Sequence, residues 1–332
     1  MYKIIKRLKI FLISFSILGC TLNENLSYNE KTVYNLNASK WGDEINSSII
    51  ILAIHGFNDY SKSFEIPANF FKKFDLFTIA IDLRGFGKNP NPGDWYSLEN
   101  HIKDLEIQIQ KIKKKYPKKK LFLMGESMGG AIVITLLNSN KNLPIDGSIL
   151  IAPAIWNFKE RNFFKSLTLN IFSKILPNLR VSGKGFIKVQ ASNNLEVLEE
   201  LSKDPFFIHK PKLESLNGVT NLMNKSFIDA RKYLKNPYYK TLIVVPINDQ
   251  IVPRKPLIGL LQEPDIKKNI GNSFDLGVYV NSYHMMLRDL EGNFISREIK
   301  EWILNRKNIL NLNSFKAPLE KLMNEPYYHI LD

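Results

Sequence analysis

Short apolar runs recur along the chain, and segments with a helical spacing of apolar residues lie between them. A continuous apolar run bounded by polar residues is typical of a strand that is buried on both faces of a parallel sheet. Six runs have this pattern: residues 48–54, 76–83, 121–125, 148–153, 241–246 and 278–280. Helical patterns occur at 61–74, 98–116, 128–137 and 295–304. The alternation predicts an α/β fold with a mostly parallel central sheet flanked by helices.

The alternation stops between residues 154 and 240, where the sequence predicts helices and loops but no central strand. The segment begins with a dense series of aromatic and large aliphatic residues: Trp156, Phe158, Phe163, Phe164, Leu167, Leu169, Ile171, Phe172, Ile175 and Leu176. A long insertion between two strands predicts a helical cap over the carboxyl edge of the sheet, where open α/β folds bind their ligands. The core then has two parts, residues 31–153 and 241–332.

Residues 1–19 have the pattern of a secretory signal. Basic residues precede the apolar stretch 10–18, which is too short to span a bilayer as a helix. The stretch ends in Leu18-Gly19-Cys20, which resembles the lipobox of bacterial lipoproteins, where the cysteine is lipidated and becomes the mature N-terminus. Cys20 is the single cysteine of the chain, so an intramolecular disulfide is excluded. The alternative is an ordinary signal peptide, or an uncleaved anchor, with an incidental cysteine.

The lipoprotein interpretation predicts an exported protein that is anchored to a membrane of the cell envelope through Cys20. Residues 20–30 are polar and would form a tether. Thr21 stands where many lipoproteins of the inner membrane have an aspartate, which favours the outer membrane if the organism has one.

Part of the formal net charge of +14 comes from basic residues that gather in two short segments. Four basic residues belong to residues 1–19, so cleavage would leave 42 basic against 32 acidic residues, or +10. Lysines also gather between residues 111 and 120, at the end of a predicted amphipathic helix. A nucleic-acid-binding surface would interleave such lysines with arginines and aromatic residues. We therefore expect no nucleic-acid partner and a solvated lysine face, with attraction to anionic lipid headgroups as the weaker alternative.

Candidate chemistry begins at Gly125-Glu126-Ser127-Met128-Gly129, which stands between an apolar run and a predicted helix. Gly-x-Ser-x-Gly in this setting is the arrangement of a nucleophile elbow, a tight turn that strains the serine backbone and presents its hydroxyl above the end of the sheet. The glycines leave room where Cβ atoms would not fit. The flanking strand and helix disfavour the alternative, a tight turn that happens to contain a serine.

Several motifs together resemble the α/β-hydrolase superfamily and, within it, the monoacylglycerol lipase and lysophospholipase group. The resemblance extends from residue 48 to the C-terminal helix, and the early strands of that fold are only faintly visible in residues 31–46. The motifs are Gly125-Glu126-Ser127-Met128-Gly129-Gly130, His55-Gly56-Phe57, Asp82-Leu83-Arg84-Gly85-Phe86-Gly87, Asp249-Gln250-Ile251-Val252-Pro253, Tyr283-His284 and, in the cap, Lys203-Asp204-Pro205.

In this fold an acid and then a histidine follow the nucleophile along the chain. His284 has the expected position after the last strand. The other four histidines do not: His101 is expected on a helix surface, and the rest are His55, His209 and His329. Asp249, after the run 241–246, is the expected acid, which would fix the imidazole tautomer and stabilise the imidazolium. Relatives more often have a glycine-containing turn before this aspartate. Asp275 is therefore the second candidate, although its place before Gly277 suggests a turn residue.

The resemblance also implies an oxyanion hole formed by the backbone N–H groups of Phe57 and Met128. It leaves His55 as a brace of its loop, and Asp82 and Arg84 as a structural pair. The sequence has no cluster at metal-ligand spacing and no Gly-x-Gly-x-x-Gly loop, so neither a metal nor a cofactor is expected.

We therefore expect a serine hydrolase that cleaves carboxylic esters through an acyl-enzyme on Ser127, with His284 as the base. The resemblance and the apolar start of the cap favour monoacylglycerols or lysophospholipids, but those side chains could equally be the cap's own core. The alternatives are esterase, peptidase or acyltransferase chemistry on the same fold, and a non-catalytic lipid-binding lipoprotein. No oligomeric state is predicted.

Overall fold

The computed structural model describes residues 35–182, 189–305, 309 and 312–326, and its folded unit begins at Leu36. The predicted signal (residues 1–19), the tether (20–30) and the lipid-attachment site Cys20 lie outside the described residues. Among the residues that are described, none of the helices has both the length and the apolar character needed to span a bilayer.

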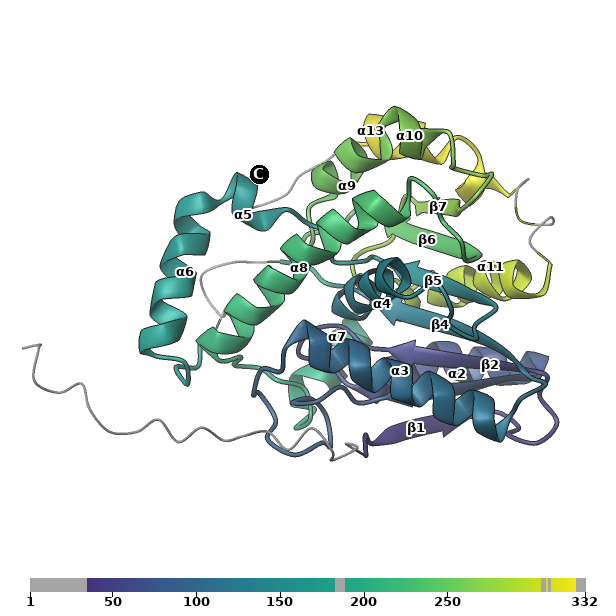
Figure 1. Ribbon diagram of the computed structural model, residues 1–332, viewed down its shortest axis with the longest axis horizontal. Coiled ribbons are helices and arrows are strands. Elements are labelled where there is room, and N and C mark those ends of the chain that lie inside the picture. Colours follow the sequence, from purple (N-terminus) through teal and green to yellow (C-terminus); the bar gives the residue numbers. More distant parts are fainter. Residues whose placement is uncertain (1–34, 183–188, 306–308, 310–311, 327–332) are drawn as a thin grey trace, which may run out of the picture. The chain divides into compact units, whose positions relative to one another are not determined.

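A seven-stranded sheet forms the centre of the folded unit, in the order β1-β3-β2-β4-β5-β6-β7 (Figure 1). β1 is antiparallel to β3, and every other neighbouring pair is parallel. The strands are β1 (Ala38–Trp41), β2 (Ile49–Ile54), β3 (Leu76–Ile81), β4 (Lys120–Glu126), β5 (Gly147–Ile151), β6 (Thr241–Pro246) and β7 (Asp275–Tyr279). The parallel strands end at one edge, and the loops that follow them carry the predicted site residues.

Helices cover both faces of the sheet (Figure 1). One face carries α3 (Leu98–Lys115), α4 (Met128–Ser139) and α8 (Leu213–Tyr233), and the other carries α2 (Glu65–Phe71) and α11 (Gly292–Leu304). The shorter elements are η1 (Ser61–Phe64), η2 (Lys72–Phe74), α9 (Arg254–Leu261), α10 (Pro264–Lys267), η3 (Met286–Arg288), η4 (Asn313–Phe315) and α13 (Pro318–Asn324). The predicted helix at 61–74 is thus one α-helix between two 3-10 turns.

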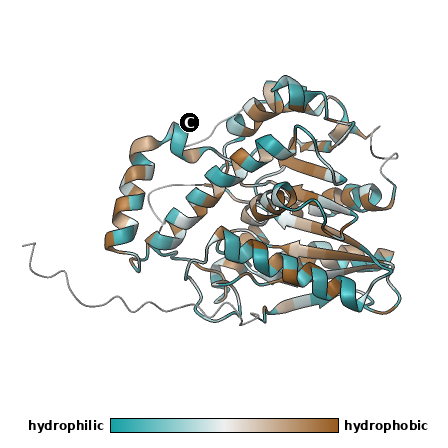
Figure 2. Cartoon of the chain, viewed as in Figure 1, coloured by the Kyte–Doolittle hydropathy of each residue, from teal (hydrophilic) through white to brown (hydrophobic). Residues whose placement is uncertain are grey.

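The apolar runs explain why the sheet is central. Every residue of β2, β3 and β6 is buried, as expected for parallel strands covered on both faces. Trp302 of α11 is fully buried, and its ring lies 6.1 Å from that of Phe122 in β4. Figure 2 shows the same division, with apolar strands between helices that have one polar side.

Residues 154–240, the cap segment, connect β5 to β6. They form α5 (Phe158–Arg161), α6 (Phe163–Ile175), α7 (Leu195–Lys203) and α8. Hydrogen bonds join the segment to the loops after β2, β3 and β7, so it lies over the carboxyl edge of the sheet. The donor–acceptor pairs are Ile208 N–Asn58 O, Ser215 Oγ–Gly93 O and Met285 N–Ala191 O.

α6 presents its apolar side chains to solvent. Ser166 and Ser173, two turns apart, are buried, and α6 packs against α8. The large apolar side chains are exposed instead: Phe163, Phe164, Leu167, Ile171, Phe172 and Ile175. The interpretation of these side chains as the cap's own core is therefore wrong for α6, although it holds for Trp156, which is buried.

Asp275 is not a turn residue, contrary to the sequence-based expectation. It is the buried first residue of β7, which starts three residues earlier than the apolar run suggested. The indole Nε1 of Trp302 donates a hydrogen bond of 2.7 Å to its Oδ2 atom. Because the first residue of this strand is a buried aspartate, a search for apolar runs does not detect where the strand begins.

Two further expectations about polar side chains are wrong. His101 is fully buried beside Trp95 rather than on a helix surface. Arg84 does not pair with Asp82, because its guanidinium donates to both oxygens of Asp104 at 2.5 and 2.6 Å. Asp82 instead accepts from backbone N–H groups in the loops after β2 and β3.

Candidate active site

Ser127 stands at the junction of β4 and α4 with a strained backbone, φ 53° and ψ −113°. Its N–H donates to the carbonyl of Ile151, and its carbonyl accepts from Ala131 and Ala154, so the turn is bonded on both sides. The turn also needs its glycines. A Cβ atom on Gly129 would stand 2.1 Å from the carbonyl oxygen of Ile54. This distance is too short for any residue with a side chain, so the position requires glycine. This is the geometry that the motif predicts for a nucleophile elbow.

The structure brings Ser127, His284 and Asp249 together in one hydrogen-bonded series. His284 Nε2 lies 2.9 Å from Ser127 Oγ, and His284 Nδ1 lies 2.7 Å from Asp249 Oδ2. Because a carboxylate can only accept, Nδ1 carries the proton and Nε2 is free to accept from the serine hydroxyl. The three residues are 8%, 6% and 4% exposed, so the series is almost closed to solvent.

Backbone groups fix the orientation of the carboxylate. Asp249 Oδ1 accepts hydrogen bonds from the N–H groups of Ile251 and Val252 at 2.8 and 2.9 Å, which leaves Oδ2 for the imidazole. This local turn follows β6, although Pro246-Ile247-Asn248 replaces the glycine-containing turn of the resembling group. The departure in sequence therefore leaves the carboxylate in reach of the histidine.

The loop that carries His284 is held by a second carboxylate and by the cap segment. Asp289 Oδ2 accepts from Tyr283 N at 2.6 Å, and its Oδ1 accepts from Ser192 Oγ at 2.5 Å. On the other side of the histidine, Met285 N donates to the carbonyl of Ala191. Residues of the cap segment therefore bond both the residue after His284 and the carboxylate that holds the residue before it.

Opposing influences set the basicity of His284. Burial lowers its pKa, but the hydrogen-bonded Asp249 carboxylate and, more weakly, Glu126 raise it, so that the net pKa lies above the ordinary value of 6.5. Arg288 acts in the lowering direction. A raised pKa means that the site stabilises the imidazolium, the form that appears when the histidine takes a proton from the serine.

The expected oxyanion donors are the N–H groups of Met128, directly after Ser127, and of Phe57, in the loop after β2. Met128 is the first residue of α4, so its N–H has no acceptor within the helix. A Cβ atom on Gly56 would stand 3.3 Å from Ser127 Cβ and 3.8 Å from its Oγ, which places the residue before Phe57 directly against the Ser127 side chain. The helix dipole adds partial positive charge at the same point.

His55 braces this loop through both ring nitrogens. Leu83 N donates to Nε2 at 3.0 Å, and Nδ1 donates to the carbonyl of Gly56 at 2.7 Å. Burial lowers its pKa, which keeps the ring neutral. It is therefore occupied within the loop and does not reach Ser127 through either nitrogen.

Sequence reasoning missed Arg288, Asp59 and the part played by Glu126. Arg288 lies 2.7 Å from Asp59 and 3.3 Å from Glu126, and all three are buried. The available signal was a glutamate directly before Ser127, because a buried carboxylate there requires a counter-charge.

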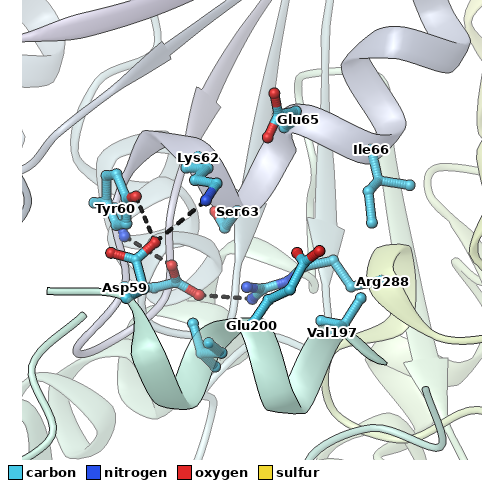
Figure 3. A pocket seen from close by; sticks show the side chains of 11 residues that line it. Asp59, Tyr60, Lys62, Ser63, Glu65, Ile66, Val197, Glu200 and Arg288 are labelled. Carbon is cyan, nitrogen blue, oxygen red and sulfur yellow. Dashed lines mark hydrogen bonds and ion pairs between the residues drawn. The ribbon is translucent and has the colours of Figure 1, made fainter. Parts of the chain in front are cut away.

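Other features of the described residues lie away from this centre. No group of three or more His, Cys, Asp or Glu side chains within them could hold a metal ion. A pocket between α2, η1 and α7 is lined by Tyr60, Lys62 and Asp204 among others and reaches Arg288, but it does not include Ser127 or His284 (Figure 3).

The chain is similar to known hydrolases over most of its length. A family model described as "Serine aminopeptidase, S33" matches residues 46–291. The monoglyceride lipase of Rattus norvegicus is 25% identical over 275 residues, covering 80% of this chain and 86% of the relative. Phospholipase YtpA of Bacillus subtilis is 23% identical over 211 residues, covering 63% of this chain and 78% of the relative.

Solved structures share the fold. The monoacylglycerol lipase of Paleococcus ferrophilus superposes with a TM-score of 0.67 at 21% identity, covering 82% of this chain and 99% of that protein. The similarity in fold therefore extends over nearly the whole length of that protein.

Proposed function

The chain belongs to the serine aminopeptidase S33 family of α/β-hydrolases, and from this premise we propose that it is a serine hydrolase that cleaves carboxylic esters of lipids. The observation that carries the proposal is the hydrogen-bonded series Ser127–His284–Asp249. A serine hydroxyl is a poor nucleophile at neutral pH, and an adjacent imidazole oriented by a carboxylate is the arrangement that activates it.

In the proposed mechanism Ser127 Oγ attacks the acyl carbonyl carbon while His284 Nε2 takes the hydroxyl proton. The carbonyl oxygen becomes an oxyanion, which the N–H groups of Phe57 and Met128 stabilise. His284 then gives its proton to the leaving alcohol, and the acyl group remains on Ser127 as an ester.

Water completes the cycle. His284 Nε2 removes a proton from a water molecule that attacks the acyl-enzyme, and returns it to Ser127 Oγ when the fatty acid leaves. Asp249 stays ionised and holds the imidazole with Nδ1 protonated throughout.

We propose monoacylglycerols or lysophospholipids as the substrate class. The relatives named monoglyceride lipase and phospholipase support this choice. The exposed apolar side of α6 supports it as well, since six large apolar side chains in contact with water carry a free-energy penalty that a lipid surface would relieve (Figure 2).

We propose a membrane anchor at Cys20 from the sequence pattern of residues 1–20 alone. Ala38 of β1 pairs with Ile81, the last residue of β3, so the chain enters the fold at the edge of the sheet that carries Ser127. Lys120 begins β4 at the opposite edge, so the lysine-rich segment lies at the far edge of the sheet from Ser127.

The experiment is hydrolysis of a chain-length series of monoacylglycerols and lysophospholipids by the chain from residue 21 onward, beside Ser127→Ala. Turnover that disappears with the serine supports the proposal, and the series ranks the substrates. Activity that survives in Ser127→Ala overturns the mechanism.

Aminopeptidase activity is the second candidate, because the family description names it. Amino-acid p-nitroanilides in the same assay distinguish it: serine-dependent release of p-nitroaniline, without ester turnover, would replace lipids by peptides as the substrate. A folded protein that turns over neither class would favour the non-catalytic lipid-binding alternative.

A further inference from the structure

Three loops that carry the proposed catalytic groups meet at one buried arginine. Arg288, four residues after His284, ion-pairs with Asp59 at 2.7 Å and with Glu126 at 3.3 Å. Asp59 lies in the loop after β2 that holds the expected oxyanion donor, and Glu126 directly precedes Ser127. Figure 3 shows the guanidinium of Arg288 directed at Asp59. Arg288 thus connects the loop that carries His284 with the loop after β2 and with the end of β4, directly before Ser127.

Stability alone is a poor explanation for this network. The three side chains are 8%, 5% and 4% exposed, and buried ion pairs are often no more stabilising than apolar packing. Two of their atoms, Glu126 Oε1 and Arg288 Nε, have no hydrogen-bond partner among the described residues. A buried, partly satisfied network beside the nucleophile indicates a role in the site rather than in folding.

We infer that Glu126 and Arg288 are positioning residues for His284. Glu126, which directly precedes Ser127 and ion-pairs with Arg288, acts on the imidazole as a second negative charge in addition to Asp249. Arg288, held by Asp59, fixes the histidine loop against the nucleophile elbow and partly neutralises that charge. This inference rests on the proposed function, since it takes His284 as the base.

The charged groups around His284 come from the end of β4 and from the segments that follow β6 and β7. Asp249 follows β6, Glu126 ends β4, Arg288 belongs to η3, and Asp289 follows Arg288. Asp59, after β2, lies behind the arginine. Burial raises the pKa of Glu126, and Arg288 opposes this rise. Burial lowers the pKa of Arg288, but the two carboxylates raise it above its ordinary value, so the arginine stays charged.

The inference predicts opposite changes in two variants. Glu126→Gln removes a negative charge of nearly the same shape, so the imidazolium is less stable and the acidic limb of the pH–rate profile moves to lower pH. Arg288→Met removes the positive charge and moves the limb to higher pH. We expect each shift to be about half a pH unit or more, and the double variant to return toward the wild-type value.

The readout is the rate at which a fluorophosphonate probe labels Ser127 between pH 4 and pH 9 (a working range of about five units around the ordinary histidine pKa). Labelling needs the activated serine but no lipid substrate. Glu298→Gln is the matched control, because Glu298 is another buried glutamate, bonded to Tyr279 in the core, and its loss should leave the limb in place.

Arg288→Lys is the second variant, in case Arg288→Met does not fold. It keeps the charge, so the limb should stay near the wild-type position, but one ammonium cannot bind both carboxylates in the same geometry, so labelling should be slower at every pH. Arg288→Lys changes the geometry and keeps the charge, whereas Glu126→Gln removes the charge and keeps the shape. Comparing the two variants therefore separates the effect of charge from the effect of geometry.

The outcomes are distinct. Limbs that stay in place, or move in the same direction in Glu126→Gln and Arg288→Met, overturn the inference while leaving the serine mechanism intact. A folded wild type that the probe does not label overturns the proposed function and the inference together. Opposite shifts with an unmoved Glu298→Gln limb support the inference.

Discussion

His284 Nε2 lies 2.9 Å from Ser127 Oγ, although the two residues are 157 positions apart in the chain. Folding achieves this because the loops after β4 and β7 emerge at the same edge of one parallel sheet. The contact gives direct predictions for the residues on either side of it.

Ser127→Ala should abolish turnover while leaving the fold unchanged. We expect kcat to fall by about 10³-fold to 10⁶-fold, since nucleophile and base act as a unit. The midpoint of thermal unfolding should change little, and the φ strain at position 127 remains. Ser139→Ala is the control: this hydroxyl bonds a helical carbonyl in α4, and its loss should leave kcat unchanged.

The two candidate acids can be separated by isosteric substitution. Asp249→Asn should lower kcat by roughly 10⁴-fold, because the amide favours the wrong imidazole tautomer. Asp275→Asn should instead reduce the free energy of unfolding by about 1–3 kcal/mol, since it weakens a buried bond to Trp302. Turnover per folded molecule and urea unfolding measure the two effects. A catalytic defect in Asp275→Asn would reverse the assignment.

Activity and stability should depend on pH in opposite directions through His284. The base must be neutral, so kcat/KM should fall as the pH drops through a pKa above 6.5. A histidine whose pKa is raised by folding stabilises the protein fully below its unfolded pKa, and this stabilisation disappears as the pH rises through the folded pKa. Hence the difference in unfolding free energy between wild type and His284→Gln should be largest in acid. A difference that grows toward alkaline pH would contradict the raised pKa.

Gly56→Ala tests the oxyanion loop, whose donors are backbone groups that side-chain substitution cannot remove. The new methyl group would stand 3.3 Å from Ser127 Cβ, so loop or nucleophile must shift by a few tenths of an ångström. We expect kcat to fall about 10- to 100-fold with little change in KM, since such donors act on the transition state. Gly259→Ala in α9 is the control, with nothing within 4 Å of its added methyl group. It should keep activity and stabilise the helix by about 0.5–1 kcal/mol.

The exposed side of α6 should govern binding to lipid rather than ester chemistry. Phe164→Glu combined with Ile175→Glu should weaken binding to anionic phospholipid vesicles at least tenfold, while hydrolysis of a soluble short-chain ester stays near the wild-type rate. Ile45→Glu is the matched control: Ile45 is 83% exposed, against 81% for Phe164, but lies between β1 and β2, at the edge opposite the cap segment. Equal effects of the two changes would rule out α6 as the lipid-facing side.

Much of the fold could be predicted because buried parallel strands are continuous apolar runs. Such runs identify β2, β3, β5 and β6 to within a few residues. β1 is harder to detect, because this short edge strand alternates exposed and half-buried residues and contains Ser39 and Lys40. The beginning of β7 was concealed by Asp275, whose charge is satisfied by a partner that is distant in the sequence.

Some residues of the candidate site could also be predicted from the sequence, and others could not. The positions of Ser127, Asp249 and His284 follow from local motifs and from strand order, so sequence could predict that they meet. Arg288 could not be found like this, because its partners Asp59 and Glu126 are distant along the chain and no local pattern connects them. The orientation of α6 was also beyond a sequence pattern: its spacing shows an apolar side, but only the packing of Ser166 and Ser173 shows which side faces solvent.

The contacts of Ala191 and Ser192 with the loop around His284 have a consequence for protein engineering. Because the cap segment is one continuous insertion between β5 and β6, it could be exchanged for another cap to change specificity. Here the exchange would also remove Ala191 O and Ser192 Oγ, acceptor and donor to the residues that align the base. A chimera that kept every catalytic side chain would therefore lose rate on all substrates alike, unless residues 190–194 were transferred with the recipient core and not with the donor cap.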